Sequence, residues 1–364
     1  MFRKTASPVQ TNRDIVITDA APCQKSLRIR VGPEAAAPVR AAVLAEFQKE
    51  ATLPGFRKGK APAELVERQY ATPIHEETVQ RLTRQAIEQA TREHTLKPVG
   101  PFEIRSAHFT DAEGLLLEAA VEVEPVFPLG AYKGIALTSQ STDVTREELE
   151  RSLATLQESM AQLVPVGTGE TKERKLPALD DELAKDLGFE NLEKLREHVH
   201  AKLREQKRAA QRQAQEAALC EELLKRHAFE VPPQLVSHQT DRLTRDFHVR
   251  LLLSGVPEDK VGDEATKFRE QLRDSAQRHV KLGFILDHVA DAEAMTVTQD
   301  EVVKRVWELA RRWKKDPAET RKIFDAQGLW PSVISTIRQE KTMALLMSSA
   351  SINNELNKVE QPRG

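Results

Sequence analysis

The feature that most constrains the fold of this chain is one long stretch with the pattern of a single helix, residues 191–227. Asn191 can cap its start, and leucines and a valine follow at helical spacing as far as Leu203. Between Leu203 and Leu219 the only apolar residues are alanines. A helix of this length measures roughly 50 Å, which is longer than a small domain is wide. Because alanines cannot anchor a thick core, we expect helical arms rather than one globule.

The composition agrees with long, charged, amphipathic helices. Of 364 residues, 30% are charged and 5% aromatic, which favours such helices over a compact enzyme with an aromatic core. The length predicts two or three domains. Net charge is −2, and residues 1–125 carry 17 Lys+Arg and 17 Asp+Glu. There is therefore no global basic field of the kind expected for a nucleic-acid coat protein.

The N-terminal third alternates between strand and helix patterns. Residues 26–31 alternate apolar and charged side chains, as expected for a strand with one buried face. Pro38 suits the first turn of a helix that continues to Glu50. The remaining expected elements are strands at 15–17, 102–109 and 115–123 and helices at 62–70 and 74–94. This order predicts an α+β domain with a small antiparallel sheet.

The rest of the chain has almost only helical patterns. Thr145 and Glu148 form a capping-box pair at the start of a helix expected over 145–163. Residues 165–177 then read as a linker that contains two glycines and several charges. Beyond residue 177 we expect six helices, at 191–227, 233–253, 258–291, 298–314, 317–326 and 331–357.

A short basic segment, residues 54–62, carries the strongest functional signal. It places three cations within four positions, with no acidic residue between Glu50 and Glu64. Its glycines and prolines keep it out of regular structure, and its single aromatic residue, Phe56, stands in a loop that can bury little. A loop tip that is basic and aromatic is suited to contact a partner outside the protein.

The segment resembles the ribosome-docking signature of the trigger factor family, which reads roughly G-F-R-x-G-K-x-P. All six fixed positions of that signature are filled in this sequence. The strand and helix order around the segment is also similar to that of the trigger factor N-terminal domain. The ribosome-binding residues that the resemblance implies are Gly55, Phe56, Arg57, Lys58, Gly59, Lys60 and Pro62.

The resemblance implies an α+β fold class with three consecutive parts. A small α+β N-terminal ribosome-binding domain would span 12–125, and an extended linker plus a helix would span 126–177. An extended, mainly α-helical substrate-binding domain that bears arms would span 178–364. Well-known trigger factors insert a prolyl isomerase domain of the FK506-binding type at the place of residues 165–177. Because that domain needs about 100 residues, a 13-residue linker cannot hold it, and we expect no isomerase domain and no enzyme activity.

The function implied is that of an ATP-independent chaperone that docks at the ribosomal exit tunnel and shields nascent chains. Phe56 would enter an apolar depression beside the tunnel, while Arg57 and Lys58 would pair with acidic side chains and with phosphate. The implied partners are the large ribosomal subunit near the exit tunnel, both protein and rRNA, and nascent or unfolded polypeptides. A weak homodimer is also implied, although no heptad seam forces one. No cofactor is expected.

Client binding is expected on a surface of dispersed apolar contacts rather than in one deep pocket. The candidates for this role are Phe247, Leu251, Met343 and Met347. Methionine adapts to irregular partners, which suits an unselective surface. The competing interpretation is that each of the four packs one helix on another.

Several alternatives and absences complete the interpretation. Other functions are a free cytosolic holdase, a periplasmic holdase of the SurA kind, an RNA-binding or ribosome-assembly protein, and an enzyme with an unrecognised site. Two distant cysteines without a CxxC favour a reduced, cytoplasmic location, and we expect neither a signal peptide nor a membrane span. His198 and His200 point to different helix faces, and Cys220 and His227 lack further ligands, so no metal site is expected.

Overall fold

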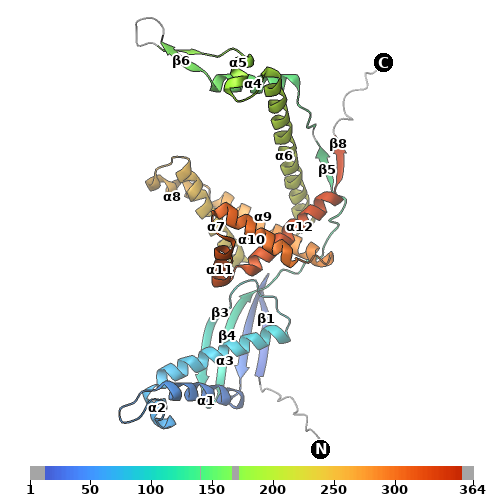
Figure 1. Ribbon diagram of the computed structural model, residues 1–364. Helices are drawn as coiled ribbons and strands as arrows, with labels where there is room; N and C mark the ends of the chain where they lie inside the picture. Colours follow the sequence, from blue (N-terminus) through green and yellow to red (C-terminus); the bar gives the residue numbers. More distant parts are fainter. Residues whose placement is uncertain (1–12, 140, 166–171, 355–364) are drawn as a thin grey trace, which may run out of the picture. The chain divides into compact units, whose positions relative to one another are not determined.

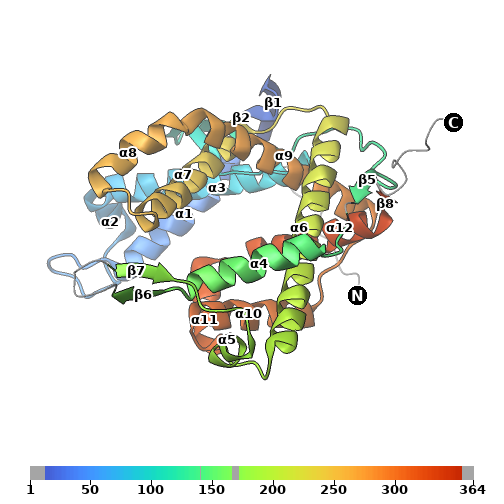
Figure 2. The same cartoon turned by 90° about the horizontal axis from the view of Figure 1, so that it is seen from above.

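The computed structural model describes residues 13–139, 141–165 and 172–354, and the chain divides into two compact units. Unit 1 comprises residues 1–128 and 227–285, and unit 2 comprises residues 129–226 and 286–364. Each unit is thus assembled from two separate stretches of chain, whereas the sequence suggested consecutive parts. The elements of both units are labelled in Figures 1 and 2.

The first part of unit 1 is a four-stranded antiparallel sheet with helices on one face (Figure 1). The strands run in the order β1-β2-β4-β3, and the helices α1 and α3 pack on each other and on the sheet. These elements and the short helix α2 have the bounds β1 Arg13–Ala21, β2 Gln24–Val31, α1 Pro33–Glu50, α2 Ala63–Gln69, α3 Ala71–Glu93, β3 Glu103–Thr110 and β4 Gly114–Glu122. The predicted α+β domain is therefore confirmed.

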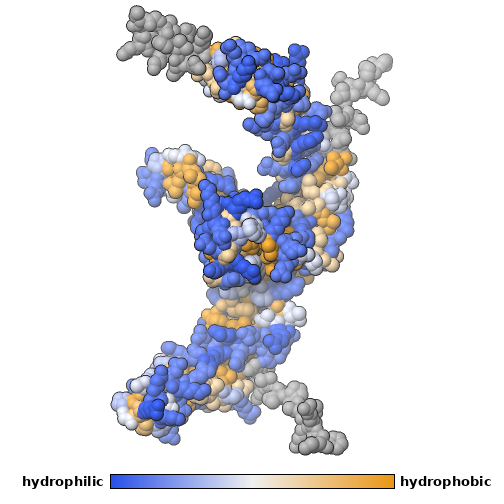
Figure 3. Space-filling model, viewed as in Figure 1, coloured by the Kyte–Doolittle hydropathy of each residue, from blue (hydrophilic) through white to orange (hydrophobic). Residues whose placement is uncertain are grey.

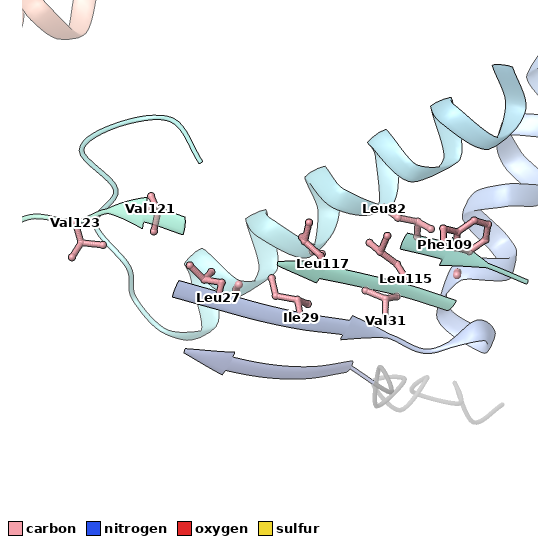
Figure 4. Close-up of a cluster of buried hydrophobic side chains, with 12 residues drawn as sticks. Leu27, Ile29, Val31, Leu82, Phe109, Leu115, Leu117, Val121 and Val123 are labelled. Atoms are coloured by element: carbon pink, nitrogen blue, oxygen red, sulfur yellow. The ribbon is translucent and has the colours of Figure 1, made fainter. Parts of the chain in front are cut away.

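The core of this part follows from the alternation along β2. Leu27, Ile29 and Val31 are fully buried, while Arg28 and Arg30 between them are exposed. Figure 4 shows the three apolar side chains pointing toward α3 together with leucines of β4. Burying one such side chain stabilises a fold by roughly 1.5–3 kcal/mol. This layer therefore packs α1 and α3 onto the sheet, and the loop that joins α1 to α2 continues from the end of α1.

One predicted helix start is wrong. Helix α1 begins at Pro33 rather than near Pro38, which lies inside the helix. The alanines and the glutamate after Pro33 are good helix formers, and Pro33 occupies a position where a missing N–H costs nothing. Pro38 and Glu34 are both exposed, so the carbonyl that Pro38 leaves without a donor can face water.

The second part of unit 1 is helical and is fastened to the end of β4. It contains α7 Pro233–Leu253, α8 Glu258–Lys267 and the first part of α9 Arg269–Ala292. The buried carboxylate of Glu122 accepts hydrogen bonds from the backbone N–H groups of Gln234 (2.8 Å) and Leu235 (3.4 Å) at the start of α7. The rings of Phe127 and Phe229 stack at 3.9 Å nearby. A single helix over 258–291 was expected, but Phe268, whose ring packs on Phe247, interrupts it.

The first part of unit 2 is organised around the longest helix, α6 Leu192–Arg226. Helix α4 Arg146–Ser159 packs across α6 (Figure 2), and α5 Asp181–Asp186 lies against both. The predicted capping box at the start of α4 is present. Instead of a plain linker, the described residues between α4 and α5 include two paired strands, β6 Gln162–Pro165 and β7 Lys172–Lys175.

The second part of unit 2 contains α10 Gln299–Trp313, α11 Pro317–Gln327 and α12 Trp330–Ser349. A helix to residue 357 was expected, but α12 ends at Ser349 and residues 351–354 form β8 Ser351–Asn354. Strand β8 pairs in parallel with β5 Ala136–Ser139. The serines at this helix end are weak helix formers, and Ile135, the residue before β5, supplies a backbone carbonyl 2.9 Å from the Ser351 nitrogen. Residues 355–357 lie outside the described residues.

The helical character of the chain after residue 177 is otherwise confirmed. In the part of the chain that the structure describes, no helix is both long enough and apolar enough to cross a lipid bilayer.

Candidate functional site

The candidate site is the loop that joins α1 to α2, which we call the tip and define as residues 54–62. A small apolar cluster packs at the base of the loop. Its buried members are Ala51, Ala61 and Val66. The ring of Phe47 on α1 meets the ring of Tyr70 at 6.2 Å beside this cluster. Contacts between α1 and α2 thus hold the two ends of the loop close together, and most residues between the two ends are exposed to solvent.

Backbone hydrogen bonds give the tip a defined path. The N–H of Phe56 donates to the Leu53 carbonyl (3.1 Å), and the N–H of Lys60 donates to the Arg57 carbonyl (2.9 Å). The N–H of Gly59 reaches back to the Ala51 carbonyl (3.2 Å). Two consecutive turns closed in this way hold the tip without burying its side chains.

Two glycines of the tip have backbone angles that other residues rarely adopt. Gly55 has φ +86° and Gly59 has φ +76°. A Cβ atom on Gly59 would also lie 2.8 Å from the Lys49 carbonyl oxygen, whereas one on Gly55 would meet nothing within 4 Å. Glycine is therefore favoured at position 59 both by the positive φ and by the close carbonyl oxygen, and at position 55 by the positive φ alone.

Most side chains of the tip are exposed, whereas that of Ala61 is buried. Phe56 is 41% exposed, which is unusual for a large aromatic ring. The four residues Arg57, Lys58, Lys60 and Pro62 are also exposed. Among the described residues, the three cations have no ion-pair partner. The tip is therefore a compact basic surface with one apolar ring, ready to pair with acidic groups or phosphate.

The structure places the predicted client residues on two helices in different units. Phe247 and Leu251 lie half-buried on α7 in unit 1, and the ring of Phe247 meets that of Phe268 at 5.2 Å. Met343 and Met347 lie half-buried on α12 in unit 2. Each pair is one helical turn apart, so its members share a face.

More exposed apolar residues near the end of α7 were not predicted. Val249 is 55% exposed and Leu253 is 84% exposed, and Leu252 and Phe268 are exposed as well. Figure 3 shows hydrophobic colour gathering at the α7 and α8 ends. The sequence did indicate this exposure. Leu251, Leu252 and Leu253 are consecutive on a helix and point in different directions, so they cannot all face one neighbouring helix.

A hollow lies between α7 and the two helices that follow it. It has a volume of about 870 Å³ and is lined by Val236, Thr240 and Thr244 from α7 and by Ala265, Arg269 and Arg273 from α8 and α9. Its mixture of apolar, hydroxyl and charged groups is suited to a polypeptide of variable sequence rather than to one small ligand. The sequence could not predict this hollow, since the interruption at Phe268 helps to form it.

Exposed apolar residues also occur on α10 in unit 2. Trp307 is 59% exposed and Val303, one turn earlier, is 47% exposed. The sequence shows that the two residues are four positions apart, but it does not show that their side chains are exposed. No group of three or more His, Cys, Asp or Glu side chains that could hold a metal ion occurs among the described residues. The rings of His198 and His227 instead contact Phe189 and Phe127, respectively.

Two family models match most of this chain. Residues 14–156 match the family model described as bacterial trigger factor protein, and residues 191–348 match the model of the bacterial trigger factor C-terminus. No isomerase model is matched between them. Residues 157–190 are far fewer than the roughly 100 residues of an ordinary domain.

Similar proteins cover nearly the whole chain. Trigger factor from Anaeromyxobacter sp. (strain Fw109-5) is 25% identical over 426 aligned positions, which include 93% of this chain and 99% of the relative. Trigger factor from Solibacter usitatus (strain Ellin6076) is 25% identical and covers 90% of this chain and 97% of the relative. The first alignment is longer than this chain of 364 residues, so the relative has residues opposite gaps here.

A solved trigger factor structure has the same fold. It comes from work on promiscuous substrate recognition in the folding and assembly activities of the trigger factor chaperone. Its TM-score is 0.55 at 20% identity, and the match covers 92% of this chain and 99% of that chain. Since the N-terminal and C-terminal models follow each other along most of the sequence, this chain belongs to the trigger factor family of ribosome-associated chaperones.

Proposed function

We propose that this protein docks at the ribosomal exit tunnel through the tip and shields nascent polypeptides without using ATP. The observation that carries the proposal is the exposed Phe56 ring beside three cations without ion-pair partners among the described residues, on a loop held by its own hydrogen bonds. Among the described residues of unit 1, no ion pair accounts for the three cations of this surface. Its chemistry fits acidic side chains and phosphate around an apolar depression.

The individual roles follow from the positions. Phe56 packs into the depression, and Arg57 and Lys58 pair with acidic groups of a large-subunit protein and with rRNA phosphate. Lys60 adds a further charge, and Pro62 directs the chain into α2, whose first residue is Ala63. A contact of this size is weak, sensitive to salt and fast to exchange, which suits a chaperone that must release each chain.

The test is co-sedimentation with ribosomes at low and raised salt, using wild type and the variant Phe56→Ala/Arg57→Ala/Lys58→Ala. We expect salt-sensitive binding that the variant loses. A matched control, Leu116→Ala/Arg28→Ala/Arg30→Ala, removes one apolar and two cationic side chains from the exposed face of the sheet in the same unit. Equal binding of the tip variant and wild type, or equal loss in the control, would contradict the proposal.

For client binding, we propose the apolar end of α7 and the adjoining hollow in unit 1, and the α12 methionines in unit 2. Leu253 and Val249 offer dispersed apolar area, and Phe247 and Leu251 lie half-buried on the same helix. The variant Leu252→Ser/Leu253→Ser should suppress the aggregation of an unfolded protein less well than wild type. Because both side chains are exposed, the fold should tolerate the change.

We further propose that the protein does not catalyse prolyl isomerisation. The support is the short connection between α4 and α5, together with the lack of a matched isomerase model between the two trigger factor models. A half-barrel with a pocket cannot be built from so few residues.

A further inference from the structure

The exposed face of α6 carries a row of three arginines, preceded by a histidine, that the proposed roles of the tip and of the apolar client surface do not account for. His200, Arg204, Arg208 and Arg212 follow one another at intervals of four residues, and all four are exposed. They line a shallow hollow of about 570 Å³ together with Ala201, Ala209 and Glu205. Adjacent members of such a row lie on the same side of a helix, about 6 Å apart along its axis.

Several other cations of α6 form ion pairs, whereas the arginines of the row form none with any residue that the structure describes. Lys207 contacts the Glu148 carboxylate at 2.7 Å, and Arg196 lies 3.4 Å from Glu150. Within the described part of the chain, Arg204, Arg208 and Arg212 form no ion pair. Like charges four residues apart also repel each other and weaken a helix. The row therefore costs stability without stabilising any contact among the described residues.

We propose that the arginine row of α6 binds acidic segments of unfolded client chains in an extended conformation. This inference rests on the proposed chaperone function and names a class of client for one surface. Alternate side chains of an extended chain point the same way and are about 6.6 Å apart, close to the spacing of the row. Carboxylates at every second client residue would therefore meet successive guanidinium groups, each of which can bind a carboxylate with two parallel hydrogen bonds.

The surroundings of the row fit a polypeptide better than a nucleic acid. The alanines at 201 and 209 leave room for a client backbone beside the long arginine side chains. The lining contains no Phe, Tyr or Trp on which bases could stack. A row of four-residue steps runs at about 26° to the helix axis, so the bound segment would cross α6 obliquely.

The test measures fluorescence anisotropy of labelled, unstructured peptides of about twelve residues, roughly twice the length needed to cover the row. One peptide carries Asp at alternate positions, and a second has Asn at the same positions. A third, uncharged apolar peptide reports ordinary client binding. We expect wild type to bind the Asp peptide about threefold to tenfold more tightly than the Asn peptide at low salt, and the difference to fade near 1 M salt.

The variant Arg208→Gln/Arg212→Gln should lose most of this preference. Glutamine forms helices well, so α6 should stay intact. The control Lys185→Gln/Lys202→Gln removes the same charge from two other exposed lysines of unit 2 and should keep the preference. Arg208→Lys/Arg212→Lys should retain part of it, because lysine keeps the charge but not the paired hydrogen bonds.

Three results would overturn the inference. They are equal affinity of wild type for the Asp and Asn peptides, an equal loss in the control variant, or tighter binding of a single-stranded oligouridine that the row variant abolishes. If the apolar peptide still binds in these cases, the chaperone proposal survives and only the arginine row fails. If no peptide binds wild type, the chaperone proposal fails with it.

Discussion

At the residue scale, Gly59 is the position of the tip that the backbone restricts most. In Gly59→Ala, the new Cβ would lie 2.8 Å from the Lys49 carbonyl oxygen at a φ of +76°. Strain at positive φ alone costs roughly 1–2 kcal/mol, and the overlap adds to it. We expect the variant to lower the free energy of unfolding by about 1–3 kcal/mol and to weaken ribosome co-sedimentation.

Gly55→Ala is the matched control, because its φ is similar and its Cβ would meet nothing within 4 Å. It should cost only the backbone strain, about 1 kcal/mol. Chemical denaturation of both variants measures the difference. Equal losses would mean that the close approach to Lys49 does not restrict the loop.

That residues 54–62 form an exposed loop could be predicted from the sequence, because the pattern is local. Glycines, prolines and cations within nine positions leave few conformations, and the exposure of Phe56 follows. The role of Gly59 could be predicted only as a turn residue. Its contact with Lys49 depends on the path of the preceding helix, which no local pattern encodes.

At the element scale, Glu122 joins the end of β4 to the start of α7. Glu122→Ala would leave the N–H groups of Gln234 and Leu235 without an acceptor in a buried place. We expect a loss of about 1–3 kcal/mol in the free energy of unfolding, with a smaller loss for Glu122→Gln, which keeps an acceptor oxygen.

The control for this change is Glu118→Ala on the same strand. Glu118 pairs with Arg28 at 2.9 Å on the surface, and such pairs contribute at most about 1 kcal/mol. Thermal unfolding of the three variants compares them. A loss for Glu118→Ala as large as that for Glu122→Ala would exclude a special role for the buried carboxylate.

The start of α4 should respond to acid. Hydrogen bonds from Lys207 and from the Thr145 backbone lower the pKa of Glu148 below its ordinary value. A lowered folded-state pKa means that the stabilisation is present above the unfolded-state pKa and is lost as pH falls through the folded-state pKa. Lys207 also donates to the Asp143 carbonyl at 2.7 Å, and that hydrogen bond does not titrate. We therefore expect Lys207→Gln to be less stable than wild type at neutral pH, and the difference to become smaller well below pH 4, measured by denaturation at several pH values. A difference of the same size at neutral and acid pH would contradict this cause.

The sequence predicted most helices and strands. The predictions were wrong where contacts with distant residues determine the local structure. The capping box at Thr145 and the core alternation of β2 are local patterns, and both are present. Strand β8 and the interruption at Phe268 depend on partners that the local sequence does not reveal, namely β5 and the ring of Phe247. The helical spacing of apolar residues continues through both segments, so the sequence pattern predicted uninterrupted helices there. That pattern carries no information about contacts with distant residues.

At the scale of the whole molecule, the chain combines both ends of a trigger factor without room for a further domain between α4 and α5. We expect the purified protein to leave the rate of cis–trans isomerisation of a proline-containing peptide unchanged, since the connection between α4 and α5 is too short for a domain that would lower the barrier of about 20 kcal/mol. A peptide assay with a known prolyl isomerase as positive control measures this. Saturable catalysis by this chain would show that an unrecognised site performs the reaction.

The most direct test of the central claim uses a photo-crosslinking amino acid placed at position 56 or at position 116. The two native side chains, Phe56 and Leu116, belong to the same unit and are 41% and 43% exposed, so that access to solvent is matched. With ribosomes at low salt, the account predicts crosslinks to large-subunit components beside the exit tunnel from position 56 and few from position 116. Equal crosslinking from both positions, or none from position 56, would contradict docking through the tip.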